Sequence, residues 1–238
     1  GWLTPEQLLV RTASNVSVDK TEISSVTASN PGTVTYGETG VRANNITLTV
    51  TPQAGVSYDH DPTYQWFELK SDGWEQIARA GGDSYPPANL DAGSHTIRGA
   101  AMYYGDWVLS NAVTVTVTPA SIAGASVSLD QNTFVYDGNT KTPAVFEVTL
   151  DNRTLTKDTD YTVKVTGQTD VGTYTLTIEG EGNYTGTATA NWSITPKPVT
   201  KPTIALTGDR TYTGAEINPT VTVKDGSTVI PASEYAVS

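Results

Sequence analysis

A strict alternation of branched apolar residues with threonine constrains this chain more than any other feature. Residues 46–50 read Ile-Thr-Leu-Thr-Val, and residues 113–117 read Val-Thr-Val-Thr-Val. Successive side chains of a strand point to opposite faces, so this pattern gives each segment one apolar face and one threonine face. The chain contains 40 Thr and 24 Val, and both residue types favour strands because branching at Cβ stiffens the side chain. The sequence therefore predicts an all-β protein.

Composition and charge exclude several classes of function. The 238 residues include 14 Lys and Arg against 25 Asp and Glu, for a net charge of −11, so the chain has no basic patch for a nucleic acid. It has no cysteine, which rules out disulfides and thiolate metal sites. The longest apolar run is the five residues 100–104, far short of the roughly 20 needed for a membrane span. We expect a soluble protein that needs no cofactor.

The two ends of the sequence give separate indications. Thr4 is suited to cap a helix, Pro5 to begin it and Gln7 to complete a capping box, which predicts a short N-terminal helix. At the other end the chain stops at Ser238 inside a strand pattern. We expect the sequence to be part of a longer protein.

Residues 1–118 are predicted to form a first domain that contains two hairpins. Residues 64–69 and 74–77 flank the turn Ser-Asp-Gly at 71–73, and residues 96–103 and 107–117 flank Gly105 and Asp106. Short strands with turns at this spacing, within about a hundred residues, favour an antiparallel sandwich of two packed sheets.

Three segments of this domain are similar to immunoglobulin-like modules of bacterial surface proteins. They are Tyr-Gln-Trp at 64–66, Asp-Ala-Gly-Ser-His at 91–95 and the last strand pattern at 110–117. The resemblance covers about residues 24–118 and implies that Trp66 is buried. It also places His95 where such domains carry a corner tyrosine that bonds to upstream backbone, and it implies an apolar contact near Leu48 and Ile97 in place of a disulfide.

An internal repeat follows the first domain. Residues 136–143 match 212–219 at an offset of 76, and residues 151–161 match 225–235 at an offset of 74. A proline-rich linker at 195–202, stiff and extended by composition, separates the copies. The sequence thus predicts a complete repeat at 119–196, then the linker and a truncated second copy at 197–238. Because half a sheet cannot bury its apolar face, we expect the second copy to pack on the preceding domain or on a neighbouring molecule, with possible self-association.

The complete repeat resembles a second family. Tyr-Asp-Gly at 136–138, Val-Gly-Thr-Tyr at 171–174 and Gly-Glu-Gly-Asn-Tyr-Thr-Gly at 180–186 look like the tandem bacterial immunoglobulin-like repeats of long surface proteins, especially of Gram-positive gut bacteria. The resemblance covers about residues 128–195, with a partial match at 205–238. It implies an extracellular protein associated with the bacterial cell wall.

Four aromatic residues beside turns are the candidate ligand-binding residues: Trp74, Tyr103, Tyr104 and Trp107. If exposed, they would suit stacking on sugar rings or anchoring a protein partner, since aromatic side chains lose little entropy on contact. Alternatively, they seal the edges and ends of the sandwich. The second interpretation is favoured because scattered surface apolar residues are ordinary.

Asp59 and Asp61 are the candidate metal ligands. They flank His60 before a proline, and calcium sites use loops of this kind, although aspartate is also common in turns for its local backbone bonds. His60 and His95 are the only histidines, and no nucleophile pattern points at either. The sequence gives no indication of an enzyme.

These observations favour a non-enzymatic spacer segment of a bacterial cell-surface protein, built of tandem immunoglobulin-like domains. One alternative is an adhesin or carbohydrate-binding module whose first domain recognises host or dietary glycans or matrix proteins. Another is an accessory region of a secreted glycoside hydrolase or peptidase.

Overall fold

The computed structural model describes residues 22–38, 41–105, 107–208, 211–212, 214, 216–217 and 219–236. The predicted N-terminal helix lies outside these residues. The described part consists of strands and three short 3-10 segments, η1 (Arg42–Asn44), η2 (Pro87–Asn89) and η3 (Ala232–Glu234), which confirms the all-β prediction. None of its helical segments is long and apolar enough to cross a membrane.

Contacts divide the chain into two compact units. The first comprises residues 1–129, 145–165 and 176–190, and the second comprises residues 130–144, 166–175 and 191–238. The candidate sites described below lie in the first unit.

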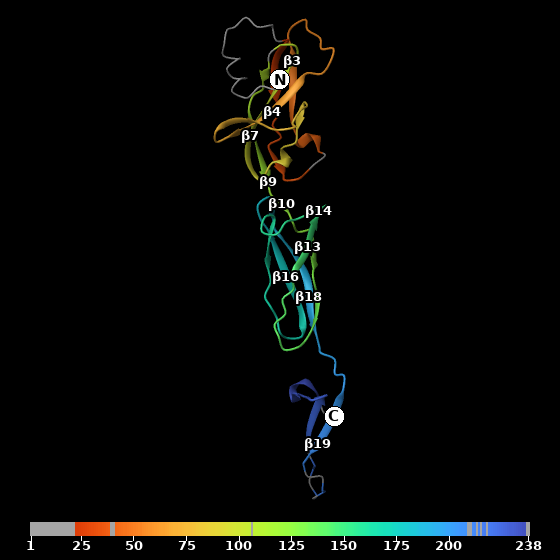
Figure 1. Ribbon diagram of the computed structural model, residues 1–238. Helices are drawn as coiled ribbons and strands as arrows, with labels where there is room; N and C mark the ends of the chain where they lie inside the picture. The colour runs from red at the N-terminus through yellow and green to blue at the C-terminus, as the bar shows by residue number, and fades with distance from the viewer. Residues whose placement is uncertain are drawn as a thin grey trace. The chain divides into compact units, whose positions relative to one another are not determined.

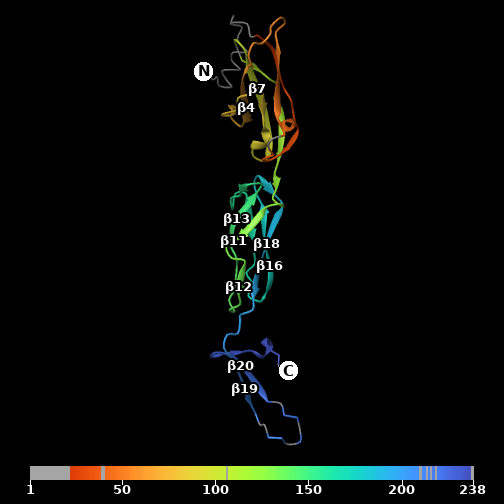
Figure 2. The ribbon, with the colours of Figure 1, turned by 90° about the vertical axis from the view of Figure 1, so that its right-hand side faces the viewer.

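Two sheets make up the first domain. One is three-stranded, in the order β1 (Ile23–Ala28), β3 (Ile46–Pro52), β6 (Ser84–Tyr85). The other has the order β2 (Thr33–Thr35), β9 (Val113–Thr118), β7 (Gly93–Met102), β4 (Thr63–Lys70), β5 (Gly73–Gln76), and β8 (Val108–Leu109) adds to β7. Figure 1 labels β3, β4, β7 and β9 of this domain, and Figure 2 shows β4 and β7 on the side opposite the red and orange strands.

The alternating segments form the core between these sheets. Ile46 and Leu48 are buried on β3, and Val113, Val115 and Val117 are buried on β9, while the threonines between these valines are exposed. All five belong to one apolar cluster to which both sheets contribute. The predicted period-2 faces are confirmed.

Both predicted hairpins are present. Leu69 pairs with Trp74 and Lys70 with Gly73 across the first turn, where Gly73 has φ 123°, a conformation that glycine adopts without steric cost. In the second hairpin β7 pairs with β8 and then with β9 in antiparallel register. Asp106 of its turn lies outside the described residues.

The details inferred for the core of the first domain also hold. Trp66 is fully buried, and its Nε1–H donates to the carbonyl of Gly82 at 2.9 Å. His95 contacts upstream backbone, with its Nε2 2.7 Å from the carbonyl oxygen of Asp91. Leu48 and Ile97 are both buried members of the same apolar cluster.

Residues 120–195 repeat the strand arrangement of the first domain. One set pairs in the order β11 (Ser126–Leu129), β13 (Val145–Leu150), β14 (Arg153–Thr154), and another in the order β12 (Thr133–Val135), β18 (Thr187–Thr195), β16 (Gly172–Gly180), β15 (Tyr161–Lys164). In both domains the first strand is split: β1 and β11 pair antiparallel with the next long strand, whereas β2 and β12 pair parallel with the last. Trp192 is buried.

The truncated copy forms a sheet of its own. Its order is β19 (Pro202–Thr207), β20 (Thr220–Asp225), β21 (Thr228–Ile230), which matches β11, β13 and β14 of the complete repeat. Ile204, Val223 and Ile230 are opposite one another and therefore share a face. All six residues of β19 are exposed, including Ile204 at 70%. On the shared face, Val223 and Ile230 are half-buried and Ile204 is exposed, and the expected packing on a neighbouring molecule stays a prediction.

Candidate functional site

A cluster of aromatic rings forms where the loop before β4 meets the end of β7. The ring centroid of Tyr103 lies 4.1 Å from that of Tyr58 and 4.6 Å from that of His60. The Tyr103 hydroxyl donates to Asp59 Oδ1 at 2.6 Å and accepts the Asp59 backbone N–H at 2.8 Å. Tyr104 packs edge-on against both Tyr103 and His60, yet 59% of its surface is exposed.

Tyr104 also has an unusual backbone. Its φ of 39° lies in the left-handed region, which non-glycine residues rarely occupy without support from their surroundings. The edge contacts with its two aromatic neighbours supply that support. The result is one exposed ring held in a fixed position at this end of the domain.

A pocket of about 490 Å³ lies beside this cluster, lined by residues 61–64 and 81–83. Asp61 and Asp83 contribute carboxylates, and Tyr64 contributes a half-buried ring. Burial raises the pKa of the Tyr64 hydroxyl, and the charges of Asp83 and then Asp61 raise it further, so both carboxylates act on the same ring.

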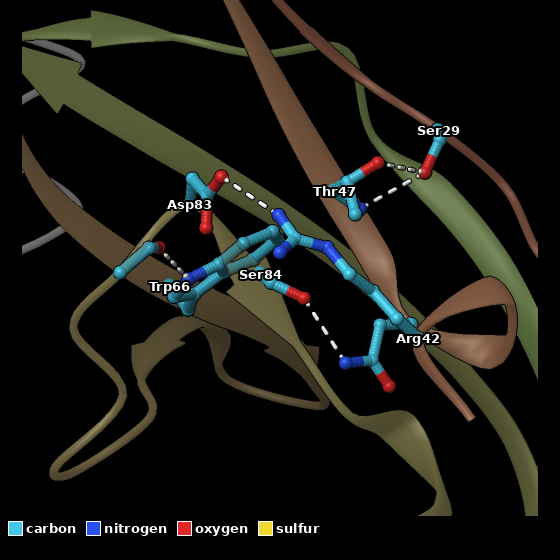
Figure 3. A network of polar contacts seen from close by, with 8 residues as sticks. Ser29, Arg42, Thr47, Trp66, Asp83 and Ser84 are labelled. Atoms are coloured by element: carbon cyan, nitrogen blue, oxygen red, sulfur yellow. Dashed lines mark hydrogen bonds and ion pairs between the residues drawn. The ribbon is translucent and has the colours of Figure 1, made fainter. Parts of the chain in front are cut away.

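Polar contacts hold the second segment that lines the pocket, residues 81–83, in place (Figure 3). Asp83 Oδ2 pairs with the guanidinium of Arg42 at 3.2 Å, and the Asp83 carbonyl accepts the backbone N–H of Leu48 at 2.7 Å. Ser84 Oγ accepts from the Asn45 amide at 3.0 Å. With the bond from Trp66 to Gly82, these contacts hold residues 82–84 against the core and against β3.

The four predicted aromatic residues fall into two separate places. Tyr103 and Tyr104 touch in the cluster described above, whereas Trp107 packs with Phe67 in a small second cluster that Trp74 borders. Tyr103 is 2% exposed and Trp107 is 7% exposed, so for these two residues the packing interpretation favoured above holds and the solvent-facing alternative does not.

The physical reason is that these rings complete the packing of the domain. Tyr103 stacks against Tyr58, and Trp107 covers Phe67 on the face of β4 that points away from the main core. Trp74 is half-buried, and the guanidinium carbon of Arg98 lies 3.8 Å from the centroid of its ring. Of the four residues, Tyr104 alone presents most of its ring to solvent.

The candidate metal ligands do not gather a third partner. Asp59 is bound to the Tyr103 hydroxyl, and His60 Nδ1 lies 2.9 Å from the carbonyl oxygen of Asp61. Across the described ranges, no group of three or more histidine, aspartate or glutamate side chains is arranged to hold a metal ion. The calcium prediction therefore gains no support from geometry.

An ionic triad centred on the buried Glu68 was not predicted from the sequence. Glu68 Oε1 lies 2.6 Å from His95 Nδ1, and Glu68 Oε2 lies 2.7 Å from Lys70 Nζ. Burial raises the pKa of Glu68, and the hydrogen bonds from Lys70 and His95 lower it more, so that the pKa lies below its ordinary value. The signal was present in the alternation, because Glu68 is two residues beyond Trp66 and therefore shares its inward face.

The connection between the first domain and the repeat is short and makes direct contacts within the first unit. Only Pro119 separates β9 from β10 (Ala120–Ser121), which pairs parallel with β17 (Tyr184–Thr185). The Asn183 amide donates to Asp91 Oδ1 at 2.9 Å, and its Oδ1 accepts the backbone N–H of Ala92 at 2.6 Å. The ring of Tyr184 packs edge-on against Tyr36 with centroids 5.5 Å apart.

Asn183 and Tyr184 belong to the glycine-rich motif at 180–186. That motif forms a turn, in which Gly182 has φ 62° and the backbone N–H of Tyr184 donates to the carbonyl of Glu181. The structure adds that the same turn supplies the side chains that contact the preceding domain.

No protein-family model matches this chain, and no curated protein sequence matches it significantly.

Proposed function

We propose that this chain is a non-enzymatic structural segment of a bacterial cell-surface protein, built of tandem immunoglobulin-like domains. The observation that carries the proposal is the junction of the first domain with the repeat. One residue connects the two domains, and the side chain of Asn183 bonds across the junction. Such a junction suits a segment that sets the spacing between the parts of the protein on either side of it.

Two further features support the proposal. The first domain and the repeat have the same split first strand although their sequences differ, which is what a series of similar modules would give. The extracellular, cell-wall location is proposed on the resemblance of the motifs at 136–138 and 180–186 to repeats of surface proteins. The acidic balance of the chain opposes non-specific association with other surfaces of like charge.

The test compares the tumbling of the two domains by ¹⁵N relaxation in the full chain. We expect the first domain and the repeat to give matching correlation times. Asn183→Ala, which removes both side-chain bonds to residues 91 and 92, should separate them.

The matched control is Asn191→Ala, which removes an exposed amide that accepts a bond from Thr175. It should leave the shared tumbling unchanged. Independent tumbling of the two domains in the unaltered chain would contradict the proposal.

A further inference from the structure

The pocket at residues 61–64 and 81–83 has a chemistry that the structural role does not use. Its volume of about 490 Å³ lies within the range of small-molecule sites, roughly 300–1,000 Å³. A spacer needs no such cavity. A ligand of this pocket must match the chemistry of the residues that line it.

The charged groups in the wall can only accept hydrogen bonds. Ionised carboxylates have no donor, so Asp61 and Asp83 call for a ligand with several O–H or N–H groups. Asp83 is already paired with Arg42, whereas no hydrogen bond or ion pair to the carboxylate of Asp61 is found in the described part of the chain. One carboxylate is thus oriented and partly neutralised, and the other is open to a ligand.

The remaining walls are an aromatic ring and bare backbone. Tyr64 is half-buried and lines the pocket, and both carboxylates lie near enough to raise the pKa of its hydroxyl. Gly81 and Gly82 contribute only backbone to the lining, and a Cβ built on either would meet nothing within 4 Å. A ligand with one apolar face and polar edges matches a lining made of an aromatic residue, bare backbone and carboxylates.

We propose that this pocket binds a pyranose sugar unit, with the C–H face of the ring against Tyr64 and its hydroxyls donating to Asp61 and Asp83. A sugar supplies several neutral donors around an apolar face, which matches both kinds of wall. A small cationic ligand fits less well, because Asp83 is already paired with Arg42, which leaves Asp61 as the one unpaired carboxylate, and because such a ligand would leave the aromatic residue of the lining without a contact.

The side chain of Trp66 can report ligand binding in this pocket. The indole N–H of Trp66 donates to the carbonyl of Gly82, which lines the pocket, so a bound ligand should shift the indole resonance of Trp66. The experiment adds the methyl glycosides of glucose, galactose, mannose, fucose and N-acetylglucosamine to the full chain and follows that resonance. The cationic probe is Nα-acetyl-lysine amide, whose side-chain ammonium carries the charge.

We expect a saturable shift with at least one glycoside at millimolar concentration, and none with the lysine probe. Asp61→Ala should weaken that binding about tenfold or more, because it removes a charged acceptor. Glu75→Ala, which removes an exposed carboxylate from β5 of the same domain, should leave it unchanged. The backbone amide spectrum verifies that both variants are folded.

Three results would overturn the proposal. The first is silence with every glycoside, and the second is a response to the lysine probe alone, which would make this a cation site. The third is glycoside binding that Asp61→Ala leaves at full strength. None of these results bears on the tumbling of the two domains, so this proposal and the structural role fail separately.

Discussion

Replacement of Glu68 by glutamine should destabilise the first domain strongly. The substitution keeps the size of the side chain but removes the charge that accepts hydrogen bonds from His95 at 2.6 Å and Lys70 at 2.7 Å. Each hydrogen bond to a charged group contributes about 1.5–3 kcal/mol, and the burial of the carboxylate offsets part of the sum. We expect the free energy of unfolding to fall by about 2 kcal/mol at pH 7. For a domain of about 100 residues this corresponds to a Tm lower by about 10 °C.

This loss should depend on pH in a defined direction. The pKa of Glu68 is lower in the folded protein, so its stabilising contribution is fully present above the pKa of the unfolded chain, about 4.3. It is lost as the pH falls through the lower folded value. The stability difference between the unaltered protein and Glu68→Gln should therefore be constant from pH 7 to about pH 5 and shrink below that.

Urea unfolding of the full chain, followed at the indole resonance of Trp66, measures the first domain alone. Glu75→Gln is the matched control, since Glu75 lies directly opposite Glu68 on β5 but is exposed. It should change the free energy of unfolding by less than about 0.5 kcal/mol. The reasoning is refuted if Glu68→Gln costs no more than the control at pH 7, or if its cost is the same at pH 3.

Three further predictions concern other parts of the chain. Gln65 is fully buried with neither its Oε1 nor its Nε2 hydrogen-bonded, so Gln65→Leu should raise the free energy of unfolding of the first domain by about 1 kcal/mol, as measured in urea. A Cβ at Gly180 would lie 2.6 Å from the backbone N of Thr185, whereas a Cβ at Gly99 would meet only the flexible end of the Leu48 side chain. Calorimetry should therefore show that Gly180→Ala lowers the Tm of its domain more than Gly99→Ala lowers the Tm of its own. If the open face of the truncated copy drives self-association, Ile204→Thr should reduce the mass per particle in light scattering at high concentration, and an unchanged mass would exclude that face as the contact.

The strands and hairpins of this protein were predictable because their signals are local. The alternation at 46–50 and 113–117 fixes which side chains face the core, and the turns at 71–73 and 105–106 fix which strands are neighbours. The contact of His95 with upstream backbone was also predictable, because its partner, the Asp91 carbonyl, lies only four residues earlier in the chain.

The pocket was not predictable in the same way. Its two halves, residues 61–64 and 81–83, are separated by the whole β4–β5 hairpin, and they meet only because Asp83 and Ser84 are held against β3. The burial of Trp107 likewise depends on a long-range contact, because Trp107 packs against Phe67 on β4. Position beside a turn left both exposure and packing open, and the contact across the sheet determined that Trp107 is buried.

The junction between the first domain and the repeat was predictable only in part. The glycine-rich motif at 180–186 is visible in the sequence, but nothing local shows that Asn183 contacts a different domain. The contact depends on Pro119 being the whole connection between β9 and β10, and that shortness emerged only with the strand boundaries.

A distance distribution between two spin labels tests the structural role most directly. The chain has no cysteine, so Ser71→Cys in the first domain and Glu147→Cys on β13 provide unique, exposed labelling sites. Electron–electron double resonance should give one narrow distance distribution, and the further change Asn183→Ala should broaden it. A distribution that is already broad with Asn183 in place would contradict a structural segment held by this junction.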